Sequence, residues 1–230
     1  MSDATNAGRA ALELTQVYCD LALALITLSP ILLQASYAAL AVYTRELIFV
    51  EMWAGQLLCE AANWVIKQLV RQPRPMDSLG TGYGFPSSHS QYMGYFATFV
   101  VLHVVCAYRP PTTNGAGTML YAIESLRGPI VAIGTTAWAV TVCYSRLHLA
   151  YHSVDQVAWG VIIGIVLGAS CTVFAHCRDC FPSIASHPLA VYFRLRDSWD
   201  IWGDGGNEDA YWMWRRKWDV KLSATKVKNA

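Results

Sequence analysis

The chain has 230 residues, of which 54% are hydrophobic and only 14% charged, with a net charge of +1 and a mean hydropathy of +0.30. Soluble domains carry about 25% charged residues, so the composition argues against a soluble globular domain. The near-neutral charge balance argues against a nucleic-acid-binding protein, which would show a basic face. We therefore expect an all-α, polytopic protein whose main partner is the membrane bilayer.

Apolar stretches long enough to cross a bilayer predict about five spanning helices. They cover residues 17–43, 47–66, 91–108, 128–145 and 156–176. In the first stretch we expect Pro30 to kink a single helix, because halves divided there would be too short to cross. The second stretch contains Glu51 and Glu60, and we expect it to lie buried among the other helices.

Both ends of the chain are polar. The amino terminus lacks a basic run before the first apolar stretch, so we expect a retained first span rather than a cleaved signal peptide. Residues 1–180 form the predicted transmembrane domain. Residues 181–230 form a tail rich in Trp, Lys and Arg, which the positive-inside tendency places in the cytosol. Its composition fits either a segment lying on an anionic leaflet or a folded tail that packs its tryptophans.

Three polar clusters stand at the margins of the apolar stretches. They are Lys67 with Arg74-Pro75, the run Pro-Ser-Ser-His that ends at His89, and Ser145-Arg146 followed by His152. With five spans, all three clusters fall on the side of the bilayer opposite the tail. Cationic side chains bind phosphoryl oxygens, and a pair of imidazoles supplies an acid and a nucleophile. The sequence therefore predicts a phosphatase site that requires neither a metal nor another cofactor.

The spacing of the clusters resembles the signature of the phosphatidic acid phosphatase type 2 superfamily, in which Lys-x6-Arg-Pro, Pro-Ser-x-His and Ser-Arg-x5-His follow one another. A narrower similarity links the chain to the eukaryotic dolichyl-diphosphatases. It rests on residues 62–67, 82–93, 145–160 and 181–188, and it extends over about residues 28–197. The resemblance implies a helical bundle with the core shared by this superfamily and the haloperoxidases.

The resemblance also implies a role for each residue of the clusters. The residues that it places around the phosphoryl group are Lys67, Arg74, Ser87, Ser88 and Arg146. His152 would attack phosphorus to form a phosphohistidine. His89 would protonate the leaving oxygen and then activate water. Imidazoles titrate near neutrality, which suits both histidines to these tasks.

Two positions depart from the superfamily pattern. Ser88 stands where glycine is usual, and its hydroxyl would either donate to the phosphate or fill space. Gln156 stands where an aspartate usually orients the nucleophilic imidazole. In a serine-protease triad, loss of the corresponding carboxylate lowers the rate by about 10⁴. We therefore expect a substitute partner for His152.

Three residues are candidates for that partner. Gln156 could accept the ring N–H through its amide oxygen, and Asp155 lies close to His152 along the same segment. Glu60 lies on the same helical face as Lys67, two turns earlier, and would otherwise pair with a lysine or arginine inside the membrane. The sequence alone leaves all three open.

The resemblance implies hydrolysis of dolichyl diphosphate on the luminal side of the endoplasmic reticulum, which would recycle the carrier for protein N-glycosylation. Lysines third and fifth from the carboxyl end resemble a dilysine retrieval signal for that compartment. Phosphatidate or shorter polyprenyl diphosphates are alternative substrates, and a non-catalytic lipid-binding membrane protein is the alternative of another class. Superfamily members commonly have six spans, with three before the first cluster. Since two are counted here, six remain possible.

Overall fold

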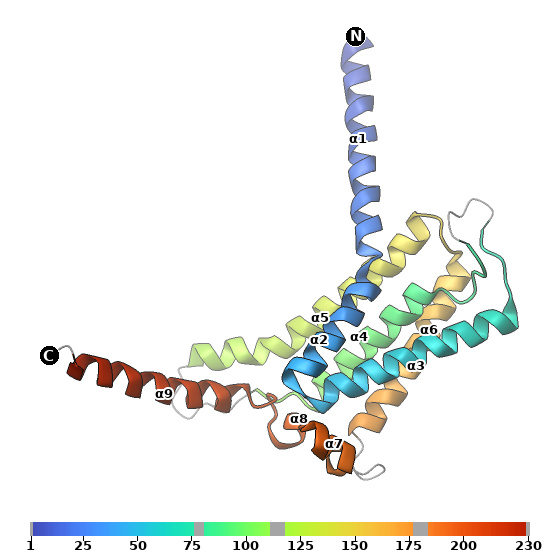
Figure 1. Cartoon of the computed structure of the whole chain (residues 1–230). Coiled ribbons are helices and arrows are strands. Elements are labelled where there is room, and N and C mark those ends of the chain that lie inside the picture. The colour runs from blue at the N-terminus through green and yellow to red at the C-terminus, as the bar shows by residue number, and fades with distance from the viewer. Residues whose placement is uncertain (1, 76–80, 111–117, 177–183, 229–230) are drawn as a thin grey trace.

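The computed structural model describes residues 2–75, 81–110, 118–176 and 184–228, and within these ranges the chain forms helices and no β-strand. The long helices are α1 (Ser2–Ile26), α2 (Ser29–Thr44), α3 (Leu47–Val70), α4 (Ser88–Cys106), α5 (Thr118–His148), α6 (Val154–His176) and α9 (Asn207–Lys228) (Figure 1). The short helices are a 3-10 turn (Ile184–Ser186), α7 (Pro188–Phe193) and α8 (Ser198–Ile201). The predicted all-α fold is confirmed.

Three of the described segments are long and apolar enough to cross a membrane: Leu12–Thr44, Ala122–His148 and Val154–His176. The remaining predicted spans form α3 and α4, which have 24 and 19 residues. These two helices are less apolar because they carry polar side chains that face the inside of the bundle, such as Gln56, Asn63 and Gln91. Asn63 of α3 donates to the amide oxygen of Gln91 on α4 at 2.7 Å, so these two polar groups satisfy each other across the helices.

The predicted single, kinked first helix is wrong. The chain breaks at Thr27 and Leu28 into α1 and α2, which run in different directions (Figure 1). Pro30 lies in the first turn of α2, where the missing proline N–H leaves no hydrogen bond unmade. The proline therefore starts a helix instead of bending one. Helices α1 and α2 nevertheless belong to one apolar segment, Leu12–Thr44, which is a single candidate membrane span.

Helix α4 lies at the centre of the bundle, and its closest neighbour is α6. Gly160, Gly164 and Gly168 recur every four residues on α6, and a Cβ at each would meet the α4 backbone at 2.7, 2.2 and 2.8 Å. Small residues at this spacing let two membrane helices approach backbone to backbone. The larger core side chains fill the other faces of α4, among them Tyr92, Tyr95 and Phe99.

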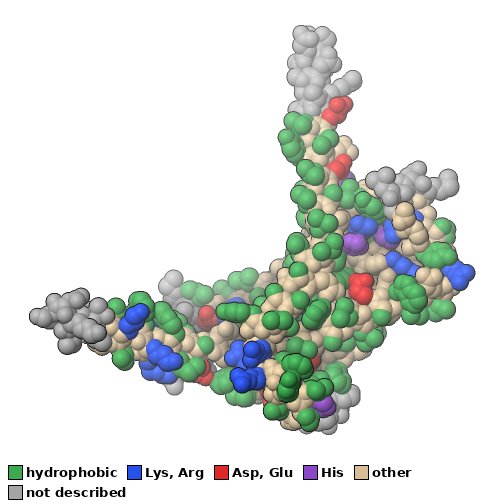
Figure 2. All heavy atoms as spheres, in the orientation of Figure 1, with side chains coloured by type: hydrophobic (Ala, Val, Ile, Leu, Met, Phe, Trp, Pro, Cys, Tyr) green, Lys and Arg blue, Asp and Glu red, His purple; other side chains and the backbone are tan. Residues whose placement is uncertain are grey.

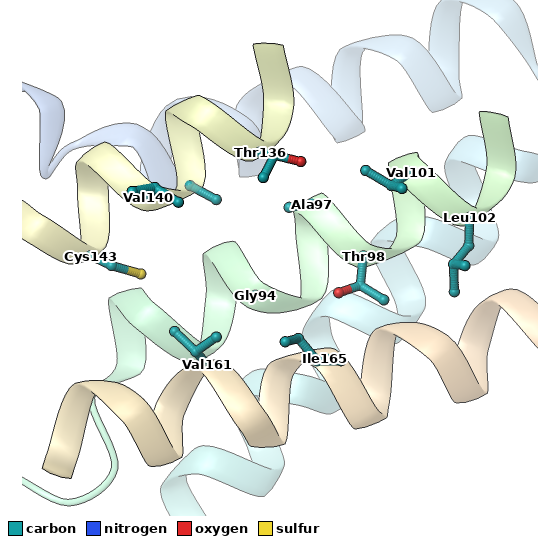
Figure 3. Close-up of a pocket in the computed structure, with 11 residues that line it drawn as sticks. Gly94, Ala97, Thr98, Val101, Leu102, Thr136, Val140, Cys143, Val161 and Ile165 are labelled. Atoms are coloured by element: carbon teal, nitrogen blue, oxygen red, sulfur yellow. The ribbon is translucent and has the colours of Figure 1, made fainter. Parts of the chain in front are cut away.

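An apolar cavity of about 390 Å³ lies between α4, α5 and α6 (Figure 3). Gly94 and Thr98 line it from α4, Thr136 from α5, and Val161 and Ile165 from α6. The cavity contains no charged side chain among its lining residues. It can take hydrocarbon but not a phosphate, so the functional site lies elsewhere.

The tail is attached to the end of the bundle opposite the polar clusters (Figure 1). The carboxylate of Glu46 pairs with Arg196 and accepts hydrogen bonds from the backbone N–H and hydroxyl of Ser198. Trp199 packs edge-on against His103 at a centroid distance of 4.5 Å. The part of the tail before Gly203 is therefore joined to the bundle, whereas α9 projects away from it.

Candidate active site

The polar clusters meet at one end of the bundle, where loops join α3 to α4 and α5 to α6. Figure 2 shows Lys, Arg and His side chains gathered at this end beside a largely hydrophobic surface. Lys67 lies in the last turn of α3, Arg74 in the following loop, His89 in the first turn of α4, Arg146 in the last turn of α5, and His152 in the loop before α6. The structure thus brings together the three clusters, which the count of spans predicted to lie on the same side of the bilayer.

His152 is 4% exposed and is held through both ring nitrogens. Its Nδ1 lies 3.1 Å from Oε1 of Gln156, and its Nε2 lies 3.3 Å from Nη1 of Arg74. Because the arginine can only donate, Nε2 accepts that hydrogen bond and Nδ1 carries the ring proton. The lone pair of Nε2 is therefore directed toward the cations of the site.

The amide of Gln156 is held in one orientation by its surroundings. Its Nε2 donates to the carbonyl oxygen of Pro73 at 2.9 Å, and its Oε1 accepts from the backbone N–H of Ser153 at 3.4 Å. A flipped amide would set two acceptors against each other at Pro73. Gly84 leaves room for this arrangement, because a Cβ there would lie 2.6 Å from the amide nitrogen. Gln156 therefore fixes the tautomer of His152.

The other two candidates for that partner lie elsewhere. Asp155 is exposed and, within the part of the chain that the structure describes, makes no hydrogen bond or ion pair with His152. Glu60 lies on the His89 side of the site, where it lines a cavity of about 330 Å³ together with Gln34, Ser88 and His89, and it makes no hydrogen bond with His152 among the described residues. The geometry thus favours Gln156 among the three sequence-derived alternatives.

Two arginines approach His152 from different directions. The chain leaves α3 at Arg71, whose φ of 51° together with the following prolines ends the helix and turns the loop back. Arg74 then donates to the carbonyl oxygen of Tyr151 at 3.2 Å. Arg146 is 6% exposed, its guanidinium stacks over the Tyr151 ring at 4.1 Å, and its Nε has no hydrogen-bond partner among the described residues.

Lys67 and the serines of the second cluster complete the polar surface. Lys67 Nζ donates to the hydroxyl oxygen of Ser88 at 2.6 Å. Ser87 is fully buried at the start of α4, where its N–H donates to the carbonyl of Gln156 at 3.0 Å. Its hydroxyl accepts from Ser90 at 3.0 Å. Ser87 therefore connects the second cluster to the helix that carries Gln156, while Ser88 contacts a cation directly.

His89 stands apart from His152, on the side of the site that faces the junction of α1 and α2. Its ring interacts with the backbone of Thr27. It shares the cavity of about 330 Å³ with Pro30 and Ile31 of α2. A group displaced from a phosphoryl centre between the two imidazoles has space to leave on this side.

The charges of Lys67, Arg74 and Arg146 act on both histidines. Lys67, Arg74 and Arg146 form no ion pair with a carboxylate among the described residues. Burial of unpaired positive charge is costly, so a site of this kind is suited to receive an anion. A tetrahedral phosphoryl group offers several oxygens to such donors.

The pKa of the His152 imidazole is lowered from 6.5 to about 4, chiefly by burial. The hydrogen bond to Gln156 opposes this shift, and the charges of Arg74, Arg146 and Lys67 contribute to it. The neutral ring, which is the nucleophilic form, therefore predominates at neutral pH.

We expect the acid limb of kcat/KM to have its midpoint near 4, since this parameter reports the free enzyme. Because the unfolded chain binds this proton more tightly, stability should fall as pH drops from 6.5 toward 4. A pH-rate profile with an acid midpoint at the ordinary histidine value would contradict this prediction.

Comparison with known proteins identifies the family. Residues 47–179, more than half of the chain, match the PAP2 superfamily. The chain belongs to that superfamily. It is 34% identical to Dolichyldiphosphatase 1 of Homo sapiens over 182 residues, which cover 76% of this chain and 74% of the human protein. It is 33% identical to Dolichyldiphosphatase of Saccharomyces cerevisiae over 154 residues, which cover 64% of this chain and 59% of the yeast protein.

A solved structure supports the same fold. The transmembrane PAP2-type phosphatidylglycerolphosphate phosphatase of Bacillus subtilis aligns with a TM-score of 0.54 at 20% identity, covering 68% of this chain and 76% of that chain. The PAP2 match and the two dolichyldiphosphatase relatives show that this chain is a multi-pass membrane phosphatase, as the sequence predicted. The predicted resemblance to the dolichyl-diphosphatases is also confirmed by the two curated relatives.

Two groups of the site were missed at the sequence level. The carbonyl of Pro73 orients Gln156, and nothing in a proline signals such a role. Asn63 and Gln91 make contacts that reach Lys67 through Ser88. The sequence did contain a signal for Asn63 and Gln91, because uncharged amides inside apolar helices need hydrogen-bond partners.

Proposed function

We propose that this PAP2 enzyme hydrolyses dolichyl diphosphate to dolichyl phosphate and phosphate through a phosphohistidine. The observation that carries the proposal is the position of His152, whose Nε2 lies among the three cations while its Nδ1 is held by Gln156. Lys67, Arg74 and Arg146 would neutralise the transferring phosphoryl group. The names of the human and yeast relatives supply the lipid.

In the first step, Nε2 of His152 forms a bond to the terminal phosphorus while the anhydride P–O bond breaks. The bonding electrons leave with the lipid phosphate on the side of His89. In the second step, water attacks the phosphohistidine, His89 takes the proton, and the P–N bond breaks to free phosphate and the His152 lone pair. Arg74 must move its N–H from Nε2 to a phosphoryl oxygen when substrate binds.

The nature of the leaving group favours a diphosphate over a monophosphate. A lipid phosphate is a monoester whose second pKa is about 6, so it departs far more readily than an alkoxide. A site in which a neutral amide orients the nucleophile is suited to this easier reaction. Purified protein should release phosphate from dolichyl diphosphate faster than from dolichyl phosphate or phosphatidate. Preference for either monophosphate would contradict the proposal, and turnover of none would favour a non-catalytic lipid-binding protein.

We expect activity to survive treatment with a chelator, because the three cations already provide the charge that a metal would supply. Vanadate, which adopts a trigonal-bipyramidal geometry like that of phosphorus in the transition state, should inhibit. Phosphate release would be measured with each reagent on one preparation. Loss of activity with the chelator and recovery with Mg²⁺ would contradict this mechanism.

We further propose that the site faces the lumen of the endoplasmic reticulum and that the tail is cytosolic. In support, the amino terminus and the catalytic loops lie toward one end of the bundle, and α7 to α9 lie toward the other (Figure 1). Basic residues concentrate in the tail. An acceptor sequence for N-glycosylation inserted near Asn6 should be modified, and one after Trp202 should not. The reverse pattern in a gel-shift assay would overturn this orientation.

The same orientation gives α9 a place on the anionic cytosolic leaflet. Tyr211, Trp214 and Trp218 form one exposed stripe, with neighbouring ring centroids 6.0 and 5.9 Å apart. Lys221 lies over the Trp218 ring at 5.7 Å. Aromatic rings with adjacent cations are typical of helices bound at a lipid surface. Trypsin should cut α9 more slowly in bilayers with anionic lipid than in neutral bilayers, and equal rates would contradict membrane association.

A further inference from the structure

We propose that Ser88, Asn63 and Gln91 are positioning residues that hold the Lys67 ammonium in the phosphoryl site. They form a chain of hydrogen bonds, here called the Ser88 relay, which starts at the backbone carbonyl of Cys59. The proposal rests on the proposed function, because it gives Lys67 the task of binding a phosphoryl group. It gives a positioning role to the amides of Asn63 and Gln91, which lie outside the three sequence clusters.

The contacts of the relay are short and mostly buried. Gln91 Nε2 donates to the Cys59 carbonyl at 2.8 Å, and Asn63 Nδ2 donates to Gln91 Oε1 at 2.7 Å. The Ser88 hydroxyl donates to Asn63 Oδ1 at 2.9 Å and accepts from Lys67 Nζ at 2.6 Å. Gln91 and Asn63 are 1% and 4% exposed, so water does not compete for these bonds.

The chain of bonds has a fixed direction. A backbone carbonyl can only accept, so Cys59 requires the NH₂ group of Gln91, and Gln91 Oε1 must face Asn63. Asn63 therefore presents its own oxygen to Ser88. That oxygen takes the serine proton, which leaves a lone pair of the hydroxyl for Lys67. The relay thus makes Ser88 an acceptor, and in this conformation the hydroxyl does not donate to a phosphate.

The direction of the relay determines which N–H donors of Lys67 stay free. A lysine ammonium has three N–H donors on a flexible stem, and fixing such a side chain costs rotamer entropy. Ser88 takes one donor and leaves two for phosphoryl oxygens. Ser88 therefore orders Lys67 before substrate arrives.

A double-mutant cycle with Lys67 tests the relay. In the otherwise unchanged protein, Ser88→Ala and Asn63→Leu should each weaken vanadate binding and lower kcat/KM roughly tenfold, as expected for a lost hydrogen bond to a charged group. In a Lys67→Met background the same changes should alter both quantities less than about twofold, because the relay then has no ammonium to hold. Ser88→Thr, which keeps the hydroxyl, should restore most of the loss.

Thr172→Val is the matched control, because it removes a buried hydroxyl on α6 whose one hydrogen bond within the described part of the chain goes to the carbonyl of Gly168. It should leave kcat/KM and vanadate binding unchanged. An equal loss from Ser88→Ala with and without Lys67, or no loss in either, would overturn the proposal. Vanadate affinity, measured by thermal stabilisation, requires no lipid. A wrong substrate assignment would therefore appear in the turnover assay and leave the result of the cycle readable.

Discussion

His152→Ala should lower turnover of the lipid diphosphate by at least about 10⁴, a loss comparable to removal of a catalytic nucleophile in other hydrolases. In the proposed mechanism, the Nε2 lone pair of His152 is the nucleophile, and the structure places this nitrogen 3.3 Å from Arg74 with Nδ1 held by Gln156. The variant should also form no acid-labile phosphoenzyme. Rapid-quench experiments with substrate labelled at the terminal phosphate would measure both quantities.

His89→Ala should behave differently and serves as the comparison. The diphosphate leaving group needs little protonation, so phosphoryl transfer to His152 continues while attack by water becomes slow. Phosphoenzyme should therefore accumulate in this variant although turnover falls. Phosphoenzyme in His152→Ala, or its absence from His89→Ala under conditions where the unchanged protein shows it, would contradict the assignment of roles.

Gln156→Leu should reduce kcat by roughly 10³, approaching the effect of about 10⁴ that follows when a triad imidazole takes the wrong tautomer. Leucine cannot accept the Nδ1 proton of His152, and it leaves the carbonyl of Pro73 without its donor. KM should change little, because the cations that hold the phosphoryl group remain. Steady-state kinetics with the lipid diphosphate would separate the two parameters.

Asp155→Asn provides a matched control for the orienting role. The residue is adjacent to Gln156 but exposed, so its amide should keep kcat within about twofold of the unchanged protein. Loss of several orders of magnitude in Asp155→Asn, together with full activity in Gln156→Leu, would show that a carboxylate orients His152 after all. Glu60→Gln would then be the next variant to measure.

The sequence indicated the site residues because their chemistry is local and their spacing is short. The spacing from Lys67 to Arg74 and from Arg146 to His152 predicted phosphate-binding cations and a nucleophile, and the structure brings these residues together. His152 and Gln156 are four residues apart, so their contact was among the sequence-derived alternatives. The sequence could not weigh Glu60 against Gln156, because helical periodicity places a residue on a face but does not say which helix packs against that face.

The break between α1 and α2 illustrates a second limit. The length and the composition of the apolar stretch both fit one long helix. The fold places the start of α2 beside the bundle, where Ser29 is buried and accepts from Trp138 of α5 at 2.9 Å. Packing partners of this kind lie far away along the chain, so the local pattern around Pro30 could not decide between a kink and a new helix.

By itself, the sequence determined that this is a helical membrane phosphatase with three cations and two histidines, because composition, hydropathy and motif spacing are properties of the chain alone. The tertiary structure decided how those groups are held. The carbonyl of Pro73 takes the NH₂ group of Gln156, so the amide oxygen of Gln156 faces His152. Asn63 takes the Ser88 proton, so the Ser88 hydroxyl can accept from Lys67. These contacts join α3, α4, α6 and two loops, and their directions depend on where a buried donor finds an acceptor.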